Sequence, residues 1–158
     1  MKPVINLDDL VLEKTEDGPY HHTYGIISNR IGAKALGYNL TIVPPDNKAN
    51  FFHNHHNNEE MFFVIEGSGI LRFGDKEYEI RKHDVIACPA GKPELAHQII
   101  NTGNCDLKYL ALSTKERVDV CEFPDSDKIS VMVGDYGAMD LFSVFKAGAK
   151  VHYAEGER

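Results

Sequence analysis

The sequence predicts an all-β protein, a single barrel or sandwich made of many short strands. From Leu36 onward, short apolar runs alternate with Gly, Pro, Asn and Asp, the residues that favour turns between strands. No segment before residue 135 shows the apolar periodicity of an amphipathic helix. Short strands at this spacing are typical of sandwiches and barrels, in which alternate side chains face a common core.

The expected strands begin after an irregular N-terminal stretch, residues 1–35. The first is Leu36–Val43, which ends at two prolines because proline cannot donate a backbone hydrogen bond. The next two, Phe51–His56 and Glu60–Ile65, are expected to form a hairpin through the turn at residues 57–58. The remaining expected elements are strands at Ile70–Phe73, Tyr78–Ile80, Val85–Cys88, Ala96–Asn101, Leu107–Leu112 and Lys128–Val133, and a helix candidate at Met139–Lys146.

Composition and charge are those of one globular domain. The chain has 158 residues, of which 42% are hydrophobic and 26% charged, so it can bury a substantial core. The net charge of −7 argues against nucleic acid or an anionic membrane surface as a partner. The start of the chain lacks the apolar stretch of a signal peptide, and the longest apolar run, Met61–Ile65, is too short to span a bilayer.

The cysteines give no sign of a disulfide framework. Cys88, Cys105 and Cys121 are widely spaced and odd in number, and none forms a CxxC pair. We therefore expect a reducing, cytoplasmic location, with the cysteines acting as small apolar residues of strands. Because the sequence contains no linker, repeat or low-complexity tract, residues 1–158 are expected to form one domain.

The chemistry of the chain is concentrated in the segment from His53 to Glu60. Side chains two residues apart share a face of a strand, so His53 and His55 point the same way and His56 points opposite. The expected hairpin brings Glu60 alongside these two imidazoles. Two histidines and a carboxylate suit a first-row divalent metal. A solvated polar loop with chance histidines is the alternative interpretation.

A fourth candidate ligand, His97, lies far along the chain in the expected strand Ala96–Asn101. Alternation places His97 and Ile99 on one face of that strand, with Gln98 and Ile100 on the other. A lone histidine in a strand is more often a core or surface residue than a ligand. The residue pattern by itself leaves both interpretations of His97 open.

These residues resemble the two sequence motifs of the cupin superfamily. The spacing His53-x-His55-x4-Glu60-x6-Gly67 matches all the ligand spacings of the first motif. The resemblance covers roughly residues 36–113. The second motif is similar to a stretch that contains His83, Pro89, Gly91, His97 and Asn101.

The resemblance implies a cupin jelly-roll barrel, the double-stranded β-helix, with its core at about residues 36–113 and irregular N- and C-terminal extensions. It also implies a divalent metal ion (zinc, iron, manganese or nickel) bound where both motifs line one mouth of the barrel. Carried over residue by residue, the implied metal ligands are His53, His55, Glu60 and His97.

Three departures from the cupin motifs affect these expectations. Asn47 and His83 stand where the motifs have glycine, and both residue types tolerate a positive φ. His83 is therefore expected to be a turn residue and not a ligand. The loop before His97, residues 92–96, is longer than usual, which puts the register of the following strand in question.

Three functions remain open at this level. A site with three histidines and one glutamate leaves open positions on a metal, which suits isomerisation of a sugar or sugar phosphate or, with iron, the use of dioxygen. The same cavity could hold a sugar, a metabolite or an ion without turnover, or the metal could serve only storage or structure. No general acid or base can be assigned, and the unranked candidates are His56, Glu59, Tyr38 and Tyr109.

The expected partners are a small-molecule ligand and a second copy of the chain, with no nucleic acid and no membrane. Alternation from His53 and Glu60 places Phe51, Phe62 and Val64 on the metal side of their strands, where they would make the cavity wall apolar. The opposite face carries exposed apolar positions that a homodimer could bury: Met61, Phe63 and Ile65.

Overall fold

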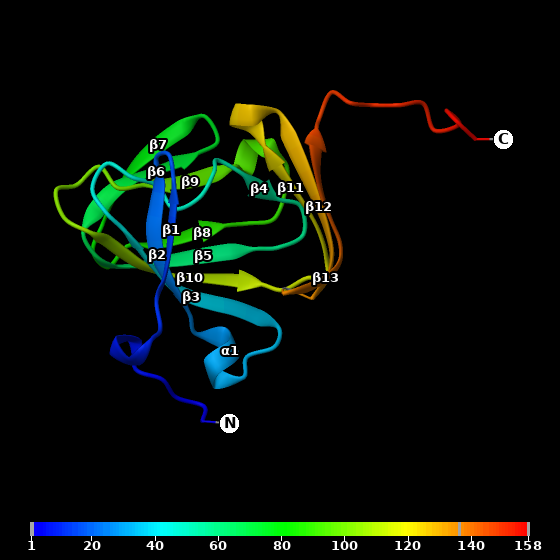
Figure 1. The fold of residues 1–158 in the computed structure, drawn as a ribbon. Coiled ribbons are helices and arrows are strands. Elements are labelled where there is room, and N and C mark those ends of the chain that lie inside the picture. Colours follow the sequence, from blue (N-terminus) through cyan, green and yellow to red (C-terminus); the bar gives the residue numbers. More distant parts are fainter. Residues whose placement is uncertain (1, 136, 158) are drawn as a thin grey trace.

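A computed structural model describes residues 2–135 and 137–157, and strands make up most of its regular structure (Figure 1). The first strands are β1 (Glu13–Asp17), β2 (Tyr20–Ile26), β3 (Leu36–Val43), β4 (Asn54–His55), β5 (Glu60–Glu66), β6 (Ser68–Phe73) and β7 (Lys76–Arg81). They are followed by β8 (Val85–Cys88), β9 (His97–Ile100), β10 (Leu107–Thr114), β11 (Val118–Phe123), β12 (Lys128–Asp135) and β13 (Ala138–Lys146). The helical segments are α1 (Ser28–Ile31) and 3-10 helices at Leu7–Asp9, Pro93–Leu95 and Pro124–Ser126.

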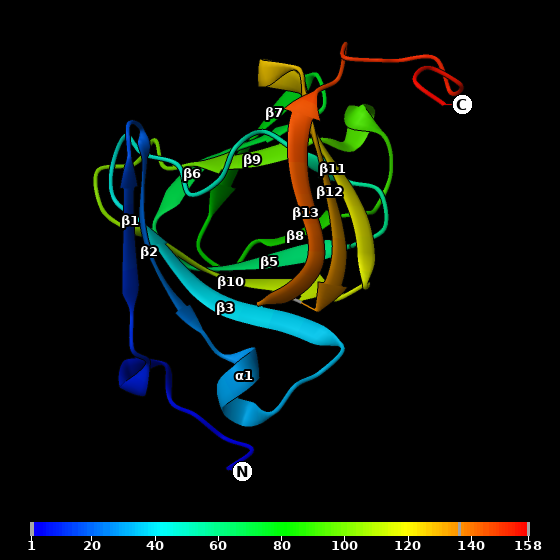
Figure 2. The same ribbon diagram turned by 45° about the vertical axis from the view of Figure 1, so that its right-hand side comes forward.

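The described strands form three sheets around a common interior. The largest has the order β1-β2-β3-β10-β5-β8, the second β13-β12-β11-β4 and the third β7-β6-β9. In Figure 2, β5, β8 and β10 lie on one side of this interior, β6 and β9 lie opposite, and β11–β13 cover a third side. Isolated backbone bridges from Lys48 to Ile100 and from His53 to His97 join the β4 segment to β9. The all-β architecture predicted from the sequence is confirmed.

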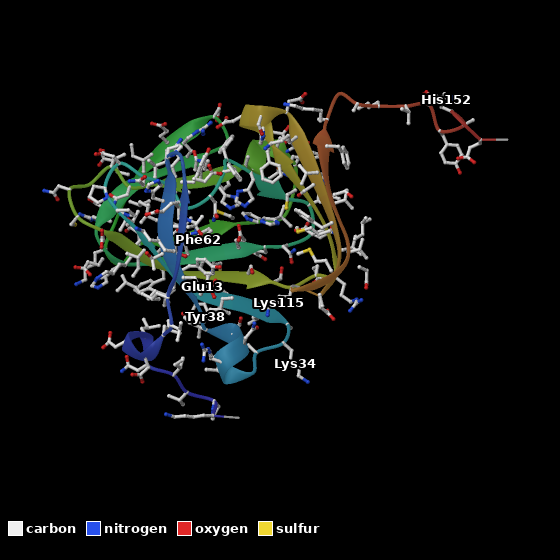
Figure 3. The ribbon with its side chains drawn as sticks, viewed as in Figure 1. Glu13, Lys34, Tyr38, Phe62, Lys115 and His152 are labelled. Carbon is white, nitrogen blue, oxygen red and sulfur yellow. The ribbon has the colours of Figure 1, made fainter. Side chains whose placement is uncertain are left out.

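Alternate residues of the strands supply the core, as β5 illustrates. Phe62 and Val64 are buried, whereas Met61 and Phe63 are 40% and 39% exposed, as alternation predicts. The Phe62 ring lies inside the barrel (Figure 3) and meets the ring of Tyr109 edge-on at 5.7 Å. Full burial of a large apolar side chain contributes roughly 1.5–3 kcal/mol, so this layer is a main source of stability.

Both ends of the chain are more regular than the sequence predicts. Residues 1–35, expected to be irregular, contain the β1–β2 hairpin, which extends the largest sheet through β3. The helix candidate Met139–Lys146 is instead part of β13, which pairs with β12. β1 is polar on both faces and β13 apolar on both, so neither shows the alternation of a half-buried strand. β11, which the sequence pattern does not predict, turns Asp119 inward and valines outward.

The predicted hairpin between Phe51–His56 and Glu60–Ile65 is wrong. The strand in the first segment is the short β4, which pairs with β11, whereas β5 pairs with β10 and β8. The turn between them therefore carries the chain from one sheet to another. Its Asn57 N–H and Asn58 side-chain amide donate hydrogen bonds to Asp119, so a distant strand anchors it.

The two turns that replace motif glycines have different outcomes. His83 has a φ of 77°, as expected for a residue at a glycine position. Near Asn47, the positive φ of 62° falls on Asp46, one residue earlier than expected. Histidine and aspartate are both among the residues that tolerate the left-handed region, so each turn keeps its shape without glycine.

The three cysteines are unpaired. Cys88 and Cys121 are buried residues of strands, and Cys105 is exposed. Within the described parts of the chain, no helix has the length and apolarity needed to cross a membrane.

We expect two copies of the chain to associate through β13. This strand lies at the edge of its sheet, where its outer backbone groups have no strand partner in the described structure. Leu141, Phe142, Val144 and Phe145 on it are 44–57% exposed, a continuous apolar stretch that association would bury. Light scattering at micromolar concentration should therefore give twice the chain mass.

Paired substitutions test this surface. Leu141→Lys combined with Phe145→Lys should give a monomer, since charge on an edge strand opposes pairing. Val4→Lys, at a 65% exposed position before β1 and outside both β13 and β5, should leave the dimer intact. A monomeric wild-type chain would contradict the expectation, as would a dimer that survives the double substitution.

Candidate metal centre

The four predicted ligands come from separate parts of the fold and meet inside the barrel. His53 precedes β4, His55 belongs to it, Glu60 begins β5 and His97 begins β9. His53 and His97 face each other through two backbone hydrogen bonds, of 3.2 Å from His53 N–H and 2.7 Å from His97 N–H. Because side chains two residues apart share a face, this pairing turns the imidazoles of His53, His55 and His97 toward one centre.

The three imidazoles converge on one carboxylate oxygen. The distances from Nε2 to Glu60 Oε2 are 2.8 Å for His97, 3.5 Å for His55 and 3.7 Å for His53. The centroid of the His53 ring lies 5.0 Å from that of the His55 ring and 4.8 Å from that of the His97 ring. The sequence prediction that these four side chains lie together agrees with this geometry.

The other ring nitrogen of each histidine faces an oxygen. His53 Nδ1 lies 2.7 Å from the carbonyl oxygen of Phe51, and His55 Nδ1 lies 2.6 Å from Asp119 Oδ2. His97 Nδ1 lies 3.4 Å from the carbonyl oxygen of Leu95. An acceptor at Nδ1 favours the tautomer that carries its proton there, so that Nε2 can offer its lone pair to an ion that replaces its contact with Glu60. Three such nitrogens and a carboxylate fit a first-row divalent ion.

Without an ion, the electrostatics hold Glu60 and His53 in forms that bind metal and hold His55 in its protonated form, whose proton a bound metal would displace. Burial by itself would raise the pKa of Glu60, but hydrogen bonds with His55 and His97 and the nearby imidazoles hold it far below its ordinary value. Burial lowers the pKa of His53 to about 4, so this ring is neutral at pH 7. Burial also opposes protonation of His55, but hydrogen bonds with Asp119, Cys121 and Glu60 raise its pKa to about 12.

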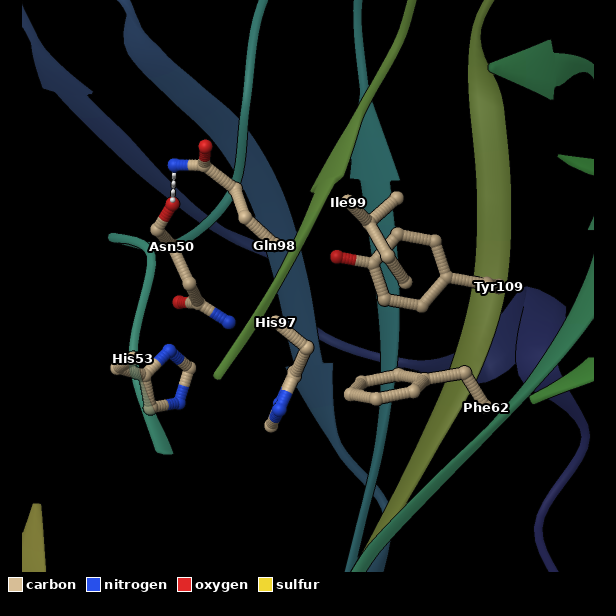
Figure 4. A pocket seen from close by; sticks show the side chains of 7 residues that line it. All are labelled: Asn50, His53, Phe62, His97, Gln98, Ile99 and Tyr109. Atoms are coloured by element: carbon tan, nitrogen blue, oxygen red, sulfur yellow. Dashed lines mark hydrogen bonds between the residues drawn. The ribbon is translucent and has the colours of Figure 1, made fainter. Parts of the chain in front are cut away.

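A small cavity lies beside the histidines (Figure 4). Its volume is about 10 Å³, enough for roughly one water molecule. Phe62, Ile99 and Tyr109 form its apolar wall, as alternation predicts for Phe62. Gln98, on the other side of β9, is buried and donates to the carbonyl oxygen of Asn50. Water therefore has little room next to His97.

The longer loop before His97 does not shift its strand. Pro93–Leu95 forms a 3-10 helix within residues 92–96, and this helix absorbs the added length. His97 then pairs with Phe73 of β6, and Ile99 with Leu71. Both His97 and Ile99 are buried on the same face, so the register that the sequence left in question is preserved.

Two residues of β11 complete the surroundings of His55 and were missed by sequence reasoning. Asp119 is 1% exposed, and Cys121 Sγ lies 3.1 Å from His55 Nδ1. His55, Asp119 and Cys121 also form a second group whose potential ligand atoms lie within 4.8 Å of one another. The only signal in the sequence is the two-residue spacing of Asp119 and Cys121, which places them on one face once β11 is known to be a strand.

Asp119 orients the His55 ring through Nδ1, the nitrogen that does not face Glu60. Its Oδ2 accepts from His55 Nδ1 at 2.6 Å and from Asn58 Nδ2 at 2.7 Å. Its Oδ1 accepts from the backbone N–H groups of Asn57 and Val120. These bonds lower the pKa of Asp119 to about 2 against the effect of burial. A carboxylate behind a metal-binding histidine holds the ring and raises its basicity.

Part of the chain is similar in sequence to a known protein family. Residues 39–113 match the family model for a cupin domain. The chain contains a cupin domain. An uncharacterized protein of Methanocaldococcus jannaschii is 36% identical over 72 residues, which cover 46% of this chain. The match spans about half of that relative, 54% of its length.

Solved structures extend the likeness beyond the cupin domain. A candidate sugar phosphate isomerase of Acidithiobacillus ferrooxidans superposes with a TM-score of 0.82 and 21% identity, covering 96% of this chain and 97% of that one. A cupin-superfamily sugar phosphate isomerase of Silicibacter pomeroyi gives 0.79 and 21% identity, covering 96% and 98%. At these identities the likeness establishes the cupin fold, and its coverage includes strands outside residues 39–113.

Asp119→Asn should destabilise the protein by roughly 3 kcal/mol. Each Asp119 oxygen accepts at least two hydrogen bonds, so the amide N–H₂ that replaces one oxygen would face donors and lose those bonds. Urea denaturation of metal-free protein measures the change. Asp135→Asn is the matched control, because this aspartate is 74% exposed and its ion pair with Arg117 lies at the surface. Equal effects of the two substitutions would show that Asp119 has no special structural role.

Proposed function

We propose that the chain is a metal-dependent sugar phosphate isomerase. The observation that carries this proposal is the convergence of three imidazole Nε2 atoms on Glu60 Oε2 inside the barrel. Two solved structures that align over almost the whole chain are named as sugar phosphate isomerases, one of them as a candidate. Their names support the reaction class, and the residues of this chain support the metal.

The proposed ligands are His53, His55, Glu60 and His97, and the ion is zinc, iron, manganese or nickel. A bound divalent ion would supply Lewis acidity, which polarises substrate oxygens and acidifies a C–H bond beside a carbonyl. Four protein ligands leave about two positions of an octahedron for neighbouring oxygens of a sugar. The Nδ1 contacts to Phe51, Asp119 and Leu95 hold the rings in the orientation that this requires.

The wall beside the ligands would keep water from the reacting carbon. Phe62 and Ile99 present only carbon to the cavity, and Tyr109 adds a buried phenol whose pKa burial raises. Among the four candidate acid–base residues, Tyr109 lines this cavity, whereas His56 and Glu59 are exposed. His56 also pairs with Glu122, at 2.6 Å, away from the ligands. Tyr109 is thus the candidate that lines the cavity beside the proposed ligands.

A sugar-binding cupin without turnover is the second candidate. It is favoured by the lining of the cavity, in which Tyr109 is the one titratable side chain besides the proposed ligands among the described residues. A phenol held neutral by burial is a poor base near pH 7. A binding or sensing protein would need no such base.

Removal of metal should lower the melting temperature of the wild-type protein. An ion that binds the folded chain and not the unfolded chain stabilises it by mass action. Differential scanning fluorimetry with and without a strong chelator, paired with elemental analysis, measures this. His55→Ala should remove most of the chelator sensitivity. Identical melting of a metal-free wild-type protein under both conditions would overturn the metal site.

Turnover separates the isomerase from the binding protein. Metal-loaded protein should interconvert an aldose phosphate and its ketose phosphate, with exchange of the transferred proton into solvent that ¹H NMR detects in D₂O. Glu60→Gln should abolish this exchange, because it removes the anionic ligand. Tight binding of the sugar phosphates without any exchange, in protein shown to carry metal, would identify a binding protein instead.

A further inference from the structure

A group of aromatic and cationic side chains lies beside the proposed metal ligands, and we call it the rim cluster. The Tyr20 and Phe51 rings are 4.6 Å apart, and Phe123 meets Phe51 edge-on at 6.1 Å. Lys128 Nζ lies 5.4 Å from the Phe51 ring and 5.7 Å from the Phe123 ring. Lys48 Nζ lies 5.8 Å from the Tyr20 ring.

The rim cluster contacts the metal centre directly. The Phe123 ring stacks on His53 with centroids 6.1 Å apart and an interplanar angle of 23°. The carbonyl oxygen of Phe51 accepts the hydrogen bond from His53 Nδ1. Phe51 is 46% exposed, so the cluster joins a proposed ligand to solvent.

Strand register places Lys128 on the same side of its sheet as the metal centre. Asp119 and Cys121 contact His55 from one face of β11, and Phe123, two residues further, continues that face to His53. Lys128 of β12 is the cross-strand partner of Phe123. Side chains of directly opposed residues project from the same face of a sheet. Lys128 therefore lies on the face that carries Phe123, Cys121 and Asp119, next to the ring that contacts His53.

The lysines of the rim cluster have no carboxylate partner within 2–135 and 137–157. Asp125 is held by both terminal nitrogens of Arg72 at 2.7 and 3.0 Å, and Lys48 interacts with it only at longer range. Lys146, on the neighbouring strand, donates to the carbonyl oxygen of Ser126. A lysine placed over an aromatic ring keeps its N–H groups available to an anion. The cluster therefore combines positive charge with apolar faces.

We propose that Lys128, assisted by Lys48, binds the phosphate of the substrate while Phe51 and Phe123 contact the sugar. The inference rests on the proposed function, since it names the residues that would select a phosphorylated sugar at that same centre. A sugar phosphate has hydroxyls that suit a metal, an apolar face and a terminal dianion, and these match the order His53, Phe123 and Lys128. The aromatic rings come from β2, β11 and the segment before β4.

Isothermal titration calorimetry of the metal-loaded, full-length protein tests the inference. The probes are glucose 6-phosphate and ribose 5-phosphate, the unphosphorylated glucose and ribose, and inorganic phosphate. At least one sugar phosphate should bind about 10-fold or more tightly than its sugar, the size expected of one charge-assisted contact. Lys128→Met should remove this preference, and Lys128→Arg should retain it. Lys34→Met is the control, because Lys34 is exposed beside α1, far from the rim cluster (Figure 3).

The outcomes separate this inference from the proposed function. Lys128→Met should keep the metal content and melting temperature of the wild type and, if turnover is found, raise KM with little change in kcat. Wild-type affinity in Lys128→Met, equal binding of sugars and sugar phosphates, or no binding of either sugar phosphate would overturn the inference. Lys128-dependent binding without metal or turnover would instead overturn the isomerase and leave the phosphate site standing.

Discussion

The buried carboxylate of Glu60 is the group around which the site is arranged. An ionised carboxylate inside a protein is costly unless its charge is compensated by close partners. The partners here are three imidazoles from two segments, one at β4 and one at β9, which are distant in the sequence. The paired backbone hydrogen bonds between His53 and His97 bring these segments together and set the direction of the rings. Glu60 in turn begins β5, a central strand of the largest sheet.

A second buried carboxylate, Asp119, supports the first from the C-terminal sheet. It accepts a hydrogen bond from Nδ1 of His55, and it accepts others from Asn57 and Asn58 in the turn that leads into β5. One residue therefore positions both an imidazole and the start of the strand that carries Glu60. Asp119 lies outside residues 39–113, so the cupin domain depends on a strand that its family model does not include. The likeness of two solved structures over 96% of the chain is consistent with one integrated fold.

The strands beyond the cupin domain also contribute side chains to the rim cluster beside His53. Tyr20 comes from β2, Phe123 from β11 and Lys128 from β12, and each reaches the neighbourhood of His53. In the proposed function, the motif spacing of His53, His55 and Glu60 supplies metal ligands, while the added strands supply aromatic and charged groups beside them. Such a division allows one metal-binding core to serve different substrates, because the chemistry and the recognition lie on different segments.

Local patterns in the sequence determined the strand class of the fold, and the resemblance of two motifs to those of the cupins supplied the four candidate ligands. Leu36–Val43 and Val85–Cys88 have the predicted bounds because apolar residues and turn formers mark them within a few positions. The spacing of His53, His55 and Glu60 is likewise local. Only the tertiary structure decided that β4 pairs with β11 and not β5, that β13 is a strand, and that Asp119 lies 2.6 Å from His55 across 64 positions of sequence. Alternation describes one strand at a time, whereas sheet partners and the contacts of Lys128 depend on packing between segments that no local pattern relates.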